Sequence, residues 1–381
     1  MNVVVFTGPT LSPREARQLL GEQAVYLPPA GQHDIYRVAL RRPRIIALID
    51  GYFQGMASVR HKEILWAISQ GIHVFGAASM GALRAAELAS FGMMGVGEIF
   101  AAYRDGLLED DDAVAVSHGQ RELDYAPASE ALVNIHATLN RAVGQGVLLQ
   151  STALGLAELA RELFHPLRHY PRLLTLARRR GLDSGQLARL EAWLPDNRVN
   201  LKRDDALALL QAVGQFLATD PPPGQVGYRF EFTSVWAATQ LPLAPALDQG
   251  PRVTLEELLD ELRLKGTRLD GTRETQLKTL AALAETSAHL TEYLSTLGDY
   301  PALLERARDK AQVLARAGWL RPDPAQLPLS PRELLDWYRQ RLADSLDPQT
   351  LVDGLGYQRE VDLYRALAGE YLYLQAGRPK L

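Results

Sequence analysis

The N-terminal part of the chain alternates short apolar runs with segments that favour a helix. Apolar runs of strand length occur at Asn2–Phe6, Ala24–Leu27, Arg44–Ile49 and Ile72–Ala77. Helices are expected after the capping sequence at residues 12–15, near Ala57–Ser69, and from Met80 onwards. Alternation of this kind is typical of a mostly parallel sheet with covering helices. It excludes an all-helical or all-β fold for this part of the chain.

We therefore predict an α/β fold, Rossmann-like or a variant of it, followed by a mainly α-helical C-terminal region. The apolar run Ala113–Ser117 could add an edge or central strand, and helical segments follow it to about residue 217. The proline-rich sequence TDPPPG within residues 218–226 predicts a linker. The expected organisation is thus an α/β domain closed by helices (1–217), the linker, and a helical region (227–381) in which Phe230–Trp236 could form a strand.

Composition narrows the range of partners. The 381 residues include 45 acidic and 41 basic side chains, which gives a net charge of −4, and no basic block is present. Neither nucleic acid nor an anionic membrane is therefore an expected partner. The N-terminus shows no secretory pattern and no apolar run approaches 18 residues, so we expect a soluble cytoplasmic protein.

The chain contains no cysteine. This excludes disulfides, thiolate metal sites, cysteine nucleophiles and persulfide carriers. Any sulfur chemistry would have to use the sulfur of a partner.

Ser79 lies between a predicted strand and a predicted helix, in the sequence GAASMGALR. A serine at such a turn can act as a nucleophile, because the following backbone N–H, here that of Met80, can stabilise an oxyanion. Serine is also a preferred N-cap, and from sequence alone the cap is the favoured interpretation. Ala77 replaces the first glycine of the G-x-S-x-G pattern, which weakens the nucleophile interpretation further.

A serine nucleophile needs a base, and His61 and Lys62 begin the predicted helix that precedes the Ser79 strand. A lysine base must be neutral, which requires its pKa to fall from about 10.4 to roughly 7–8. His61 needs little tuning and could be oriented by Asp50 or by an acidic residue of 109–112. The alternative for Lys62 is a solvated helix lysine.

Polar groups also follow the other predicted strands. Functional groups gather where loops leave the carboxyl ends of parallel strands, and Gly8-Pro9-Thr10 and Asp50 occupy such positions. The Gly8 loop could help to form an oxyanion hole, or could be an ordinary tight turn. A metal site is weakly indicated because no H-x-x-x-H or H-E-x-x-H spacing occurs. The candidate ligands are His33, Asp34, His61, Asp110, Asp111, Asp112 and His118.

Several segments in the same order resemble the TfuA-like protein family. They are VFTGPTL at 5–11, LPPA at 27–30, DGYF at 50–53, VRHKEIL at 59–65, GAASMGALRAAEL at 76–88, FGMMGVGEIFAAYRDG at 91–106 and DDDAVAVSH at 110–118. A weaker segment, NRVNLKRDDALALL at 197–210, extends the resemblance to about residue 217. Because several segments occur in the same order, this resemblance is far more specific than any single motif.

The resemblance implies a partner of a YcaO enzyme in thioamidation of a ribosomally made precursor peptide or protein. The implied activity is hydrolysis of the thiocarboxylate of a ThiS-like ubiquitin-fold sulfur carrier, which supplies sulfide without a cofactor or a metal. It also implies a serine–lysine pair, which falls on Ser79 and Lys62. Met80 and Gly8 would then hold the oxyanion, and His61 and Asp50 would be auxiliary. A slot of small residues (Gly76, Ala77, Ala78 and Gly81) could admit the narrow carrier tail; the alternative is that these residues only allow close packing of helix on strand. The alternative is a non-catalytic adaptor that binds and activates YcaO.

Overall fold

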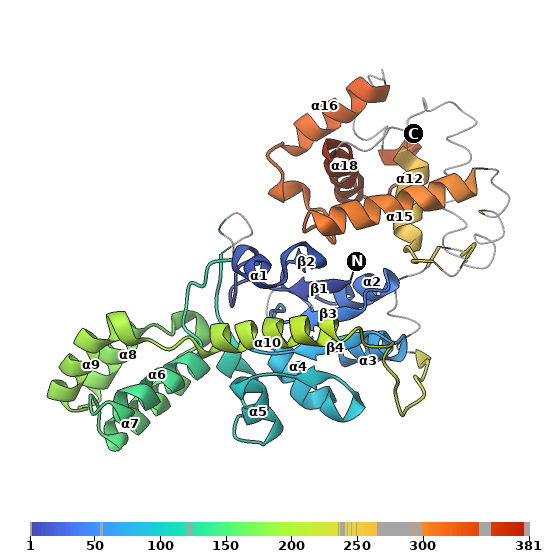
Figure 1. Cartoon of the computed structure of the whole chain (residues 1–381). Helices are drawn as coiled ribbons and strands as arrows, with labels where there is room; N and C mark the ends of the chain where they lie inside the picture. The colour runs from blue at the N-terminus through green and yellow to red at the C-terminus, as the bar shows by residue number, and fades with distance from the viewer. Residues whose placement is uncertain are drawn as a thin grey trace. The chain divides into compact units, whose positions relative to one another are not determined.

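The computed structural model describes residues 2–53, 56–119, 123, 125–234, 236, 241, 243–244, 246–248, 250–264, 294, 299–342 and 352–376. The chain forms two compact units (Figure 1). The first comprises residues 1–39 and 43–231, and the second comprises residues 40–42 and 232–381. The predicted linker, 218–226, lies within the first unit, where the Gly224 N–H donates to the Gly71 carbonyl at 2.9 Å.

A five-stranded parallel sheet forms the centre of the first unit (Figure 1). Its strands are β1 (Val3–Phe6), β2 (Ala24–Leu27), β3 (Ile45–Leu48), β4 (His73–Gly76) and β5 (Met94–Gly95). Their order is β2-β1-β3-β4-β5, one of the two common orders of doubly wound sheets. The predicted α/β fold is confirmed. The order reverses between β1 and β3, which places a crevice at the carboxyl ends of these two strands.

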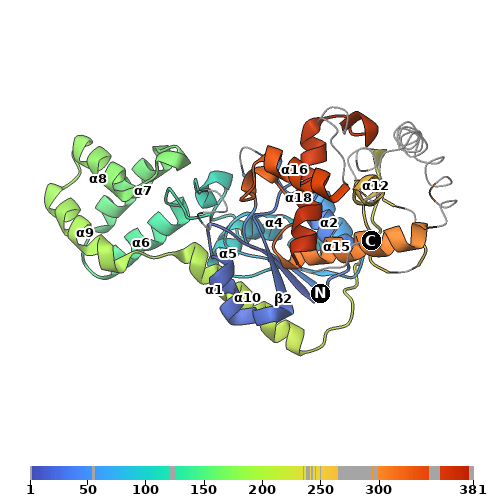
Figure 2. The ribbon, with the colours of Figure 1, turned by 90° about the horizontal axis from the view of Figure 1, so that it is seen from above.

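Helices cover both faces of the sheet. On one face, α1 (Pro13–Leu20) and α10 (Leu201–Ala218) lie side by side (Figure 2). They share one apolar core with the strands, which includes Ala16, Leu20, Leu209, Leu210, Val213, Val3, Val5, Ile45 and Ala47. On the other face, α4 (Met80–Leu88) packs against β4 and β3, and α3 (His61–Ser69) packs against β4. The alternating side chains of the buried strands supply both cores.

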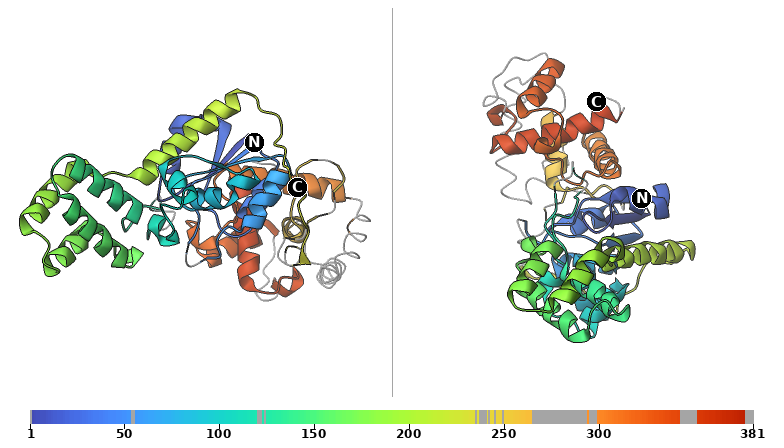
Figure 3. Two further views of the ribbon diagram at one scale, coloured as in Figure 1. Left: turned by 90° about the horizontal axis from the view of Figure 1, so that it is seen from below. Right: turned by 90° about the vertical axis from the view of Figure 1, so that its left-hand side faces the viewer.

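Four further helices form an arm at one end of the first unit, from which α10 returns along the sheet (Figures 2 and 3). They are α6 (Leu132–Gly144), α7 (Gln150–Glu162), α8 (Tyr170–Arg179) and α9 (Ser184–Asn197). Their capping groups are local: the Asp183 carboxylate accepts from the Gln186 N–H at the start of α9, and the Asn200 amide oxygen accepts from the Arg203 N–H at the start of α10.

Some predicted elements are wrong. Residues 113–117 form no strand: a 3₁₀ turn covers Asp111–Val114, and the fifth strand is β5 instead. The reason is that Asp112 is anchored to Arg168, as described below, so this segment cannot join the sheet edge. The helices α2 (Asp34–Leu40) and α5 (Glu98–Arg104) were not predicted. Residues 230–234 and 236, the described part of the other expected strand, are not in a strand.

Within its described part, the second unit is helical, as predicted. It contains α12 (Leu255–Leu264), α15 (Tyr300–Arg316), α16 (Pro331–Leu342) and α18 (Glu360–Gln375) around an apolar core. Four buried charges cross this core. Arg306 and Lys310 of α15 each pair with Glu261 of α12 and Glu370 of α18, and the Lys310 Nζ lies 2.8 and 2.9 Å from the two carboxylates. The charges therefore balance within the core.

Candidate functional site

Ser79 occupies a sharp turn between β4 and α4. The preceding residue, Ala78, has a φ of +66°, a conformation that is rare for a residue with a side chain. Ser79 is only 8 % exposed, and it stands at the N-cap position of α4 without making a capping hydrogen bond. Among the described residues, no group accepts a hydrogen bond from the Met80 N–H. The turn thus holds a hydroxyl and a backbone donor that the helix itself does not use.

The small residues around Ser79 serve close packing. A Cβ atom on Gly81 would lie 1.8 Å from the Leu48 carbonyl oxygen, and one on Gly76 would lie 2.1 Å from the Gly81 carbonyl oxygen. Glycine is therefore required where α4 crosses the sheet. Neither glycine lines the pocket beside Ser79, and neither do Ala77 or Ala78. The expected slot of small residues for a carrier tail is wrong.

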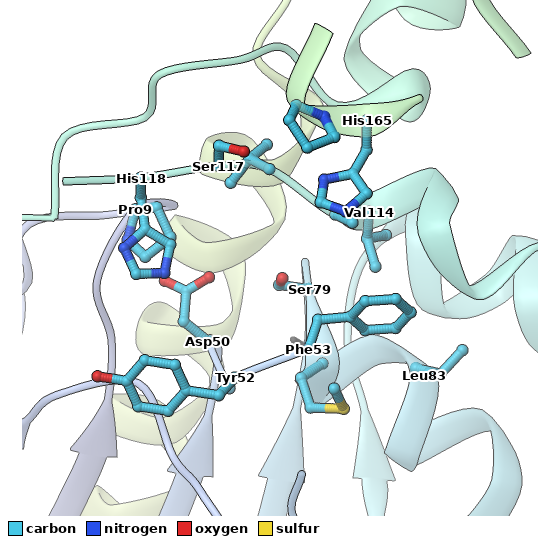
Figure 4. A pocket seen from close by; sticks show the side chains of 15 residues that line it. Pro9, Asp50, Tyr52, Phe53, Ser79, Leu83, Val114, Ser117, His118 and His165 are labelled. Carbon is cyan, nitrogen blue, oxygen red and sulfur yellow. The ribbon is translucent and has the colours of Figure 1, made fainter. Parts of the chain in front are cut away.

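A pocket of about 310 Å³ opens over Ser79 (Figure 4). We call it the Ser79 pocket. In Figure 4 the Ser79 hydroxyl lies between Asp50 and His118 on one side and His165 on the other. The Ser79 pocket is lined by Pro9, residues 50–53, Ser79, Met80, Leu83, residues 114–118, His165 and Pro166. The pocket thus lies at the carboxyl ends of the strands, where the sheet order predicts a ligand site.

Asp50 ties the loop after β3 to the loop after β1. Its carboxylate accepts from the Gly8 N–H at 2.8 Å, from the Thr10 N–H at 3.0 Å and from the Thr10 hydroxyl at 2.6 Å. The Gly8 N–H is therefore occupied, and the expectation that it holds an oxyanion is not met in this arrangement. Met80 remains as the backbone donor beside Ser79. Asp50 does not orient His61, because its carboxylate is turned to this loop.

His61 and Lys62 lie outside the set of residues that line the Ser79 pocket. Helix α3 begins at His61, so both residues lie in its first turn as expected, although the apolar pattern placed the helix near Ala57–Ser69. The His61 Nε2 lies 2.7 Å from the Glu87 carboxylate. The Lys62 ammonium lies 4.7 Å from the centre of the Phe230 ring. Among the described residues, Lys62 and Ser79 share no hydrogen bond, and the serine–lysine pair that the resemblance implies stays a prediction.

The third residue of this motif, Glu63, has a structural role. Its side chain is buried and accepts hydrogen bonds from the backbone N–H groups of His33 (2.9 Å) and Tyr36 (3.4 Å), at the start of α2. Burial raises the pKa of Glu63 to about 7, although these hydrogen bonds oppose the shift. Glu63 therefore stabilises α2 from a distance of 27 to 30 residues in sequence.

The raised pKa of Glu63 predicts a pH dependence of stability. The folded state keeps the proton at pH values where the unfolded chain has lost it, so this contribution is complete below about pH 4.5 and is lost as the pH rises through about 7. We expect the thermal midpoint of the first unit to fall between about pH 5 and pH 8. The Glu63→Gln variant should show a smaller fall in the same scan. Equal slopes for the two proteins would contradict this assignment.

Two histidines in the Ser79 pocket were not recognised as candidate bases. The His118 Nδ1 lies 2.8 Å from the Gly119 carbonyl oxygen, which requires a proton on Nδ1 and leaves the lone pair on Nε2 when the ring is neutral. His165 is 6 % exposed, and burial together with the nearby Arg168 lowers its pKa, against an opposing effect of Asp112. A neutral imidazole is the form that can accept the proton of a serine.

Arg168 holds the two walls of the pocket together. Its side chain is fully buried and donates to the carbonyl oxygens of Ala160 (3.1 Å), Leu163 (3.0 Å) and Asp112 (2.9 Å), and to the Asp112 carboxylate at 2.7 Å. Asp112 leads into residues 114–118, and Arg168 follows His165. Asp112, the last residue of the acidic run at 109–112, therefore has a structural role, because it anchors this segment to Arg168.

Residues 50–169 match the sequence model of the TfuA-like protein family. The resemblance noted in the sequence is thereby confirmed for this segment. The TfuA-like segment contains Asp50, Ser79, His118 and His165, and thus most of the Ser79 pocket. Comparison with curated proteins finds no match.

Among the described residues, no group of three or more histidine, aspartate or glutamate side chains is arranged to hold a metal ion. Within the same part of the chain, no helix is both long enough and apolar enough to cross a membrane.

Proposed function

We propose that this protein is an accessory hydrolase of YcaO-dependent thioamidation. The match to the TfuA-like family suggests a role associated with that modification. The proposed substrate is the C-terminal thiocarboxylate of a ThiS-like sulfur carrier, and the proposed product is sulfide for the YcaO enzyme acting on a precursor peptide. The observation that carries the hydrolase proposal is the Ser79 turn. There a hydroxyl that makes no capping hydrogen bond and the unused Met80 N–H lie beside one pocket.

The proposed reaction has two steps. A base takes the proton of the Ser79 hydroxyl, and the oxygen attacks the thiocarboxylate carbon. The negative charge that develops on the carbonyl oxygen is stabilised by the Met80 N–H, a contribution of roughly 3 kcal/mol in comparable sites. The carbon–sulfur bond then breaks, the protonated base gives its proton to the sulfur, and the sulfur leaves as hydrosulfide. Water hydrolyses the acyl-serine, which returns the carrier as a carboxylate and restores the serine.

The pocket supports a histidine as the base. His118 and His165 line it together with Ser79, whereas Lys62 does not. Burial and Arg168 lower the pKa of His165, which keeps this imidazole neutral at physiological pH. The Gly119 carbonyl fixes the ring of His118 with Nε2 as the acceptor. Lys62 remains the alternative that the family resemblance suggests.

The test is the rate of sulfide release from a purified thiocarboxylated carrier, without YcaO. We expect release by the wild-type chain, and a loss of about 10²- to 10⁴-fold when the base is replaced. His118→Gln and His165→Gln identify which histidine acts, and Lys62→Met is the matched comparison outside the pocket. A loss confined to Lys62→Met would assign the base to lysine. If the wild-type chain releases no sulfide, the hydrolase proposal is wrong and the adaptor alternative is favoured.

A further inference from the structure

A second pocket, of about 520 Å³, adjoins the Ser79 pocket. The two share Pro9 and Val116 in their walls. We call the second one the Lys202 pocket. Its polar side chains come from the start of α10, from α6 and from the start of α8, where the helical arm meets the sheet. Nothing in the proposed hydrolysis uses these residues.

Lys202 is a buried cation with few partners. Lys202 is 3 % exposed, and its Nζ donates to the Val114 carbonyl oxygen at 2.7 Å. An ammonium carries three N–H groups. In the described part of the chain, no other acceptor bonds to this ammonium, and it forms no ion pair within 4.0 Å. Burial lowers its pKa, and the charges of Asp50 and Glu130 act in the opposite direction.

Arg198 contributes a second cation to this pocket. Its guanidinium lies 5.0 Å from the centre of the Tyr170 ring, and among the described residues it forms no ion pair. The one acid in the pocket, Glu130, accepts a hydrogen bond from the Asn134 amide at 2.8 Å. Two cations therefore face a cavity in which a single carboxylate is already engaged. A buried cation of this kind is costly unless an anion accompanies it.

We propose that the Lys202 pocket binds an oxyanion of the carboxylate or phosphate class. Lys202 supplies N–H donors from the buried end and Arg198 supplies its planar guanidinium from the exposed end. The site goes beyond the proposed hydrolysis and does not depend on it. The oxyanion can be the terminal carboxylate of a peptide tail or a free phosphate, since both present the same acceptor oxygens.

The test is calorimetric titration of the full chain with three probes: inorganic phosphate, a peptide that ends in Gly-Gly with a free carboxylate, and the same peptide amidated. We expect saturable binding of phosphate or of the free peptide, and none of the amidated peptide. Arg198→Gln and Lys202→Met should each weaken binding at least about tenfold, as expected for a charged hydrogen bond. Arg179→Gln, an exposed arginine of α8 outside the pocket, is the control.

The outcomes are distinct. Binding of phosphate alone identifies a free anion, and binding of the free peptide alone identifies a tail carboxylate; both support the site. No saturable binding of either probe overturns it, and so does unchanged binding by both variants. Arg198 is exposed, so its variant is expected to fold and decides the question if Lys202→Met does not fold. Sulfide release by the wild-type chain is measured separately, so failure of one proposal leaves the other intact.

Discussion

Replacing Ser79 with alanine is expected to lower the rate of sulfide release by at least about 10³-fold. The reason is that the substitution removes the oxygen that forms the acyl intermediate, and no other residue can inherit this role at the turn. The measurement is initial-rate release from the thiocarboxylated carrier. Ser151→Ala, an exposed serine at the start of α7, should release sulfide at the wild-type rate.

The loss should be one of activity and not of folding. The Ser79 side chain makes no capping hydrogen bond, so its removal costs α4 none of the stabilisation that an N-cap normally provides. Thermal unfolding of Ser79→Ala should therefore remain close to that of the wild-type chain. Release of sulfide by this variant at the wild-type rate would exclude Ser79 as the nucleophile.

Replacing Lys310 with methionine is expected to destabilise the second unit by about 3 kcal/mol or more. Lys310 is 7 % exposed, and its ammonium pairs with both Glu261 and Glu370. Without it, the two buried carboxylates share Arg306 alone, and one negative charge remains uncompensated. Hydrogen exchange of the α15 and α18 amides measures the effect on this unit separately from the first.

The double variant Lys310→Met with Glu370→Gln is the matched control. It removes one positive and one negative charge, so the core is again neutral and part of the lost stability should return. Such a recovery would show that the stability is lost through the unbalanced charge and not through the lost packing of the lysine side chain. Unchanged exchange in Lys310→Met, or a double variant less stable than the sum of the single effects, would contradict this explanation.

Local patterns were sufficient to predict four of the five strands of the sheet, all but β5. The β2 strand has the predicted bounds, and β1, β3 and β4 lie within the predicted runs, because strands buried on both faces are continuous apolar runs. The capping box at Ser12 and Glu15 is also present as predicted, since both partners lie within one turn. The position of Ser79 between β4 and α4 follows from the same local patterns.

The partners of Ser79 could not be predicted in this way. The family resemblance, and not the local pattern, assigned Lys62 as the base. Lys62 lies in the first turn of α3, as expected, but its ammonium lies over the Phe230 ring and it does not line the Ser79 pocket. His165 comes from a segment 86 positions further along, and it reaches the pocket through the contact between Arg168 and Asp112, which are 56 positions apart. No periodicity or spacing marks such a contact. What does locate the pocket is the strand order, because ligand sites of such sheets lie at the carboxyl ends of the strands where the order reverses.

The most direct test of Ser79 as the nucleophile is to trap the acyl-enzyme. The wild-type chain is mixed with the thiocarboxylated carrier, quenched in acid within a turnover, digested, and analysed by mass spectrometry. We expect a carrier-derived acyl ester on Ser79, with the mass of the carrier tail less hydrogen sulfide, and none in Ser79→Ala. Sulfide release accompanied by an adduct on another residue would contradict the assignment of Ser79 as the nucleophile.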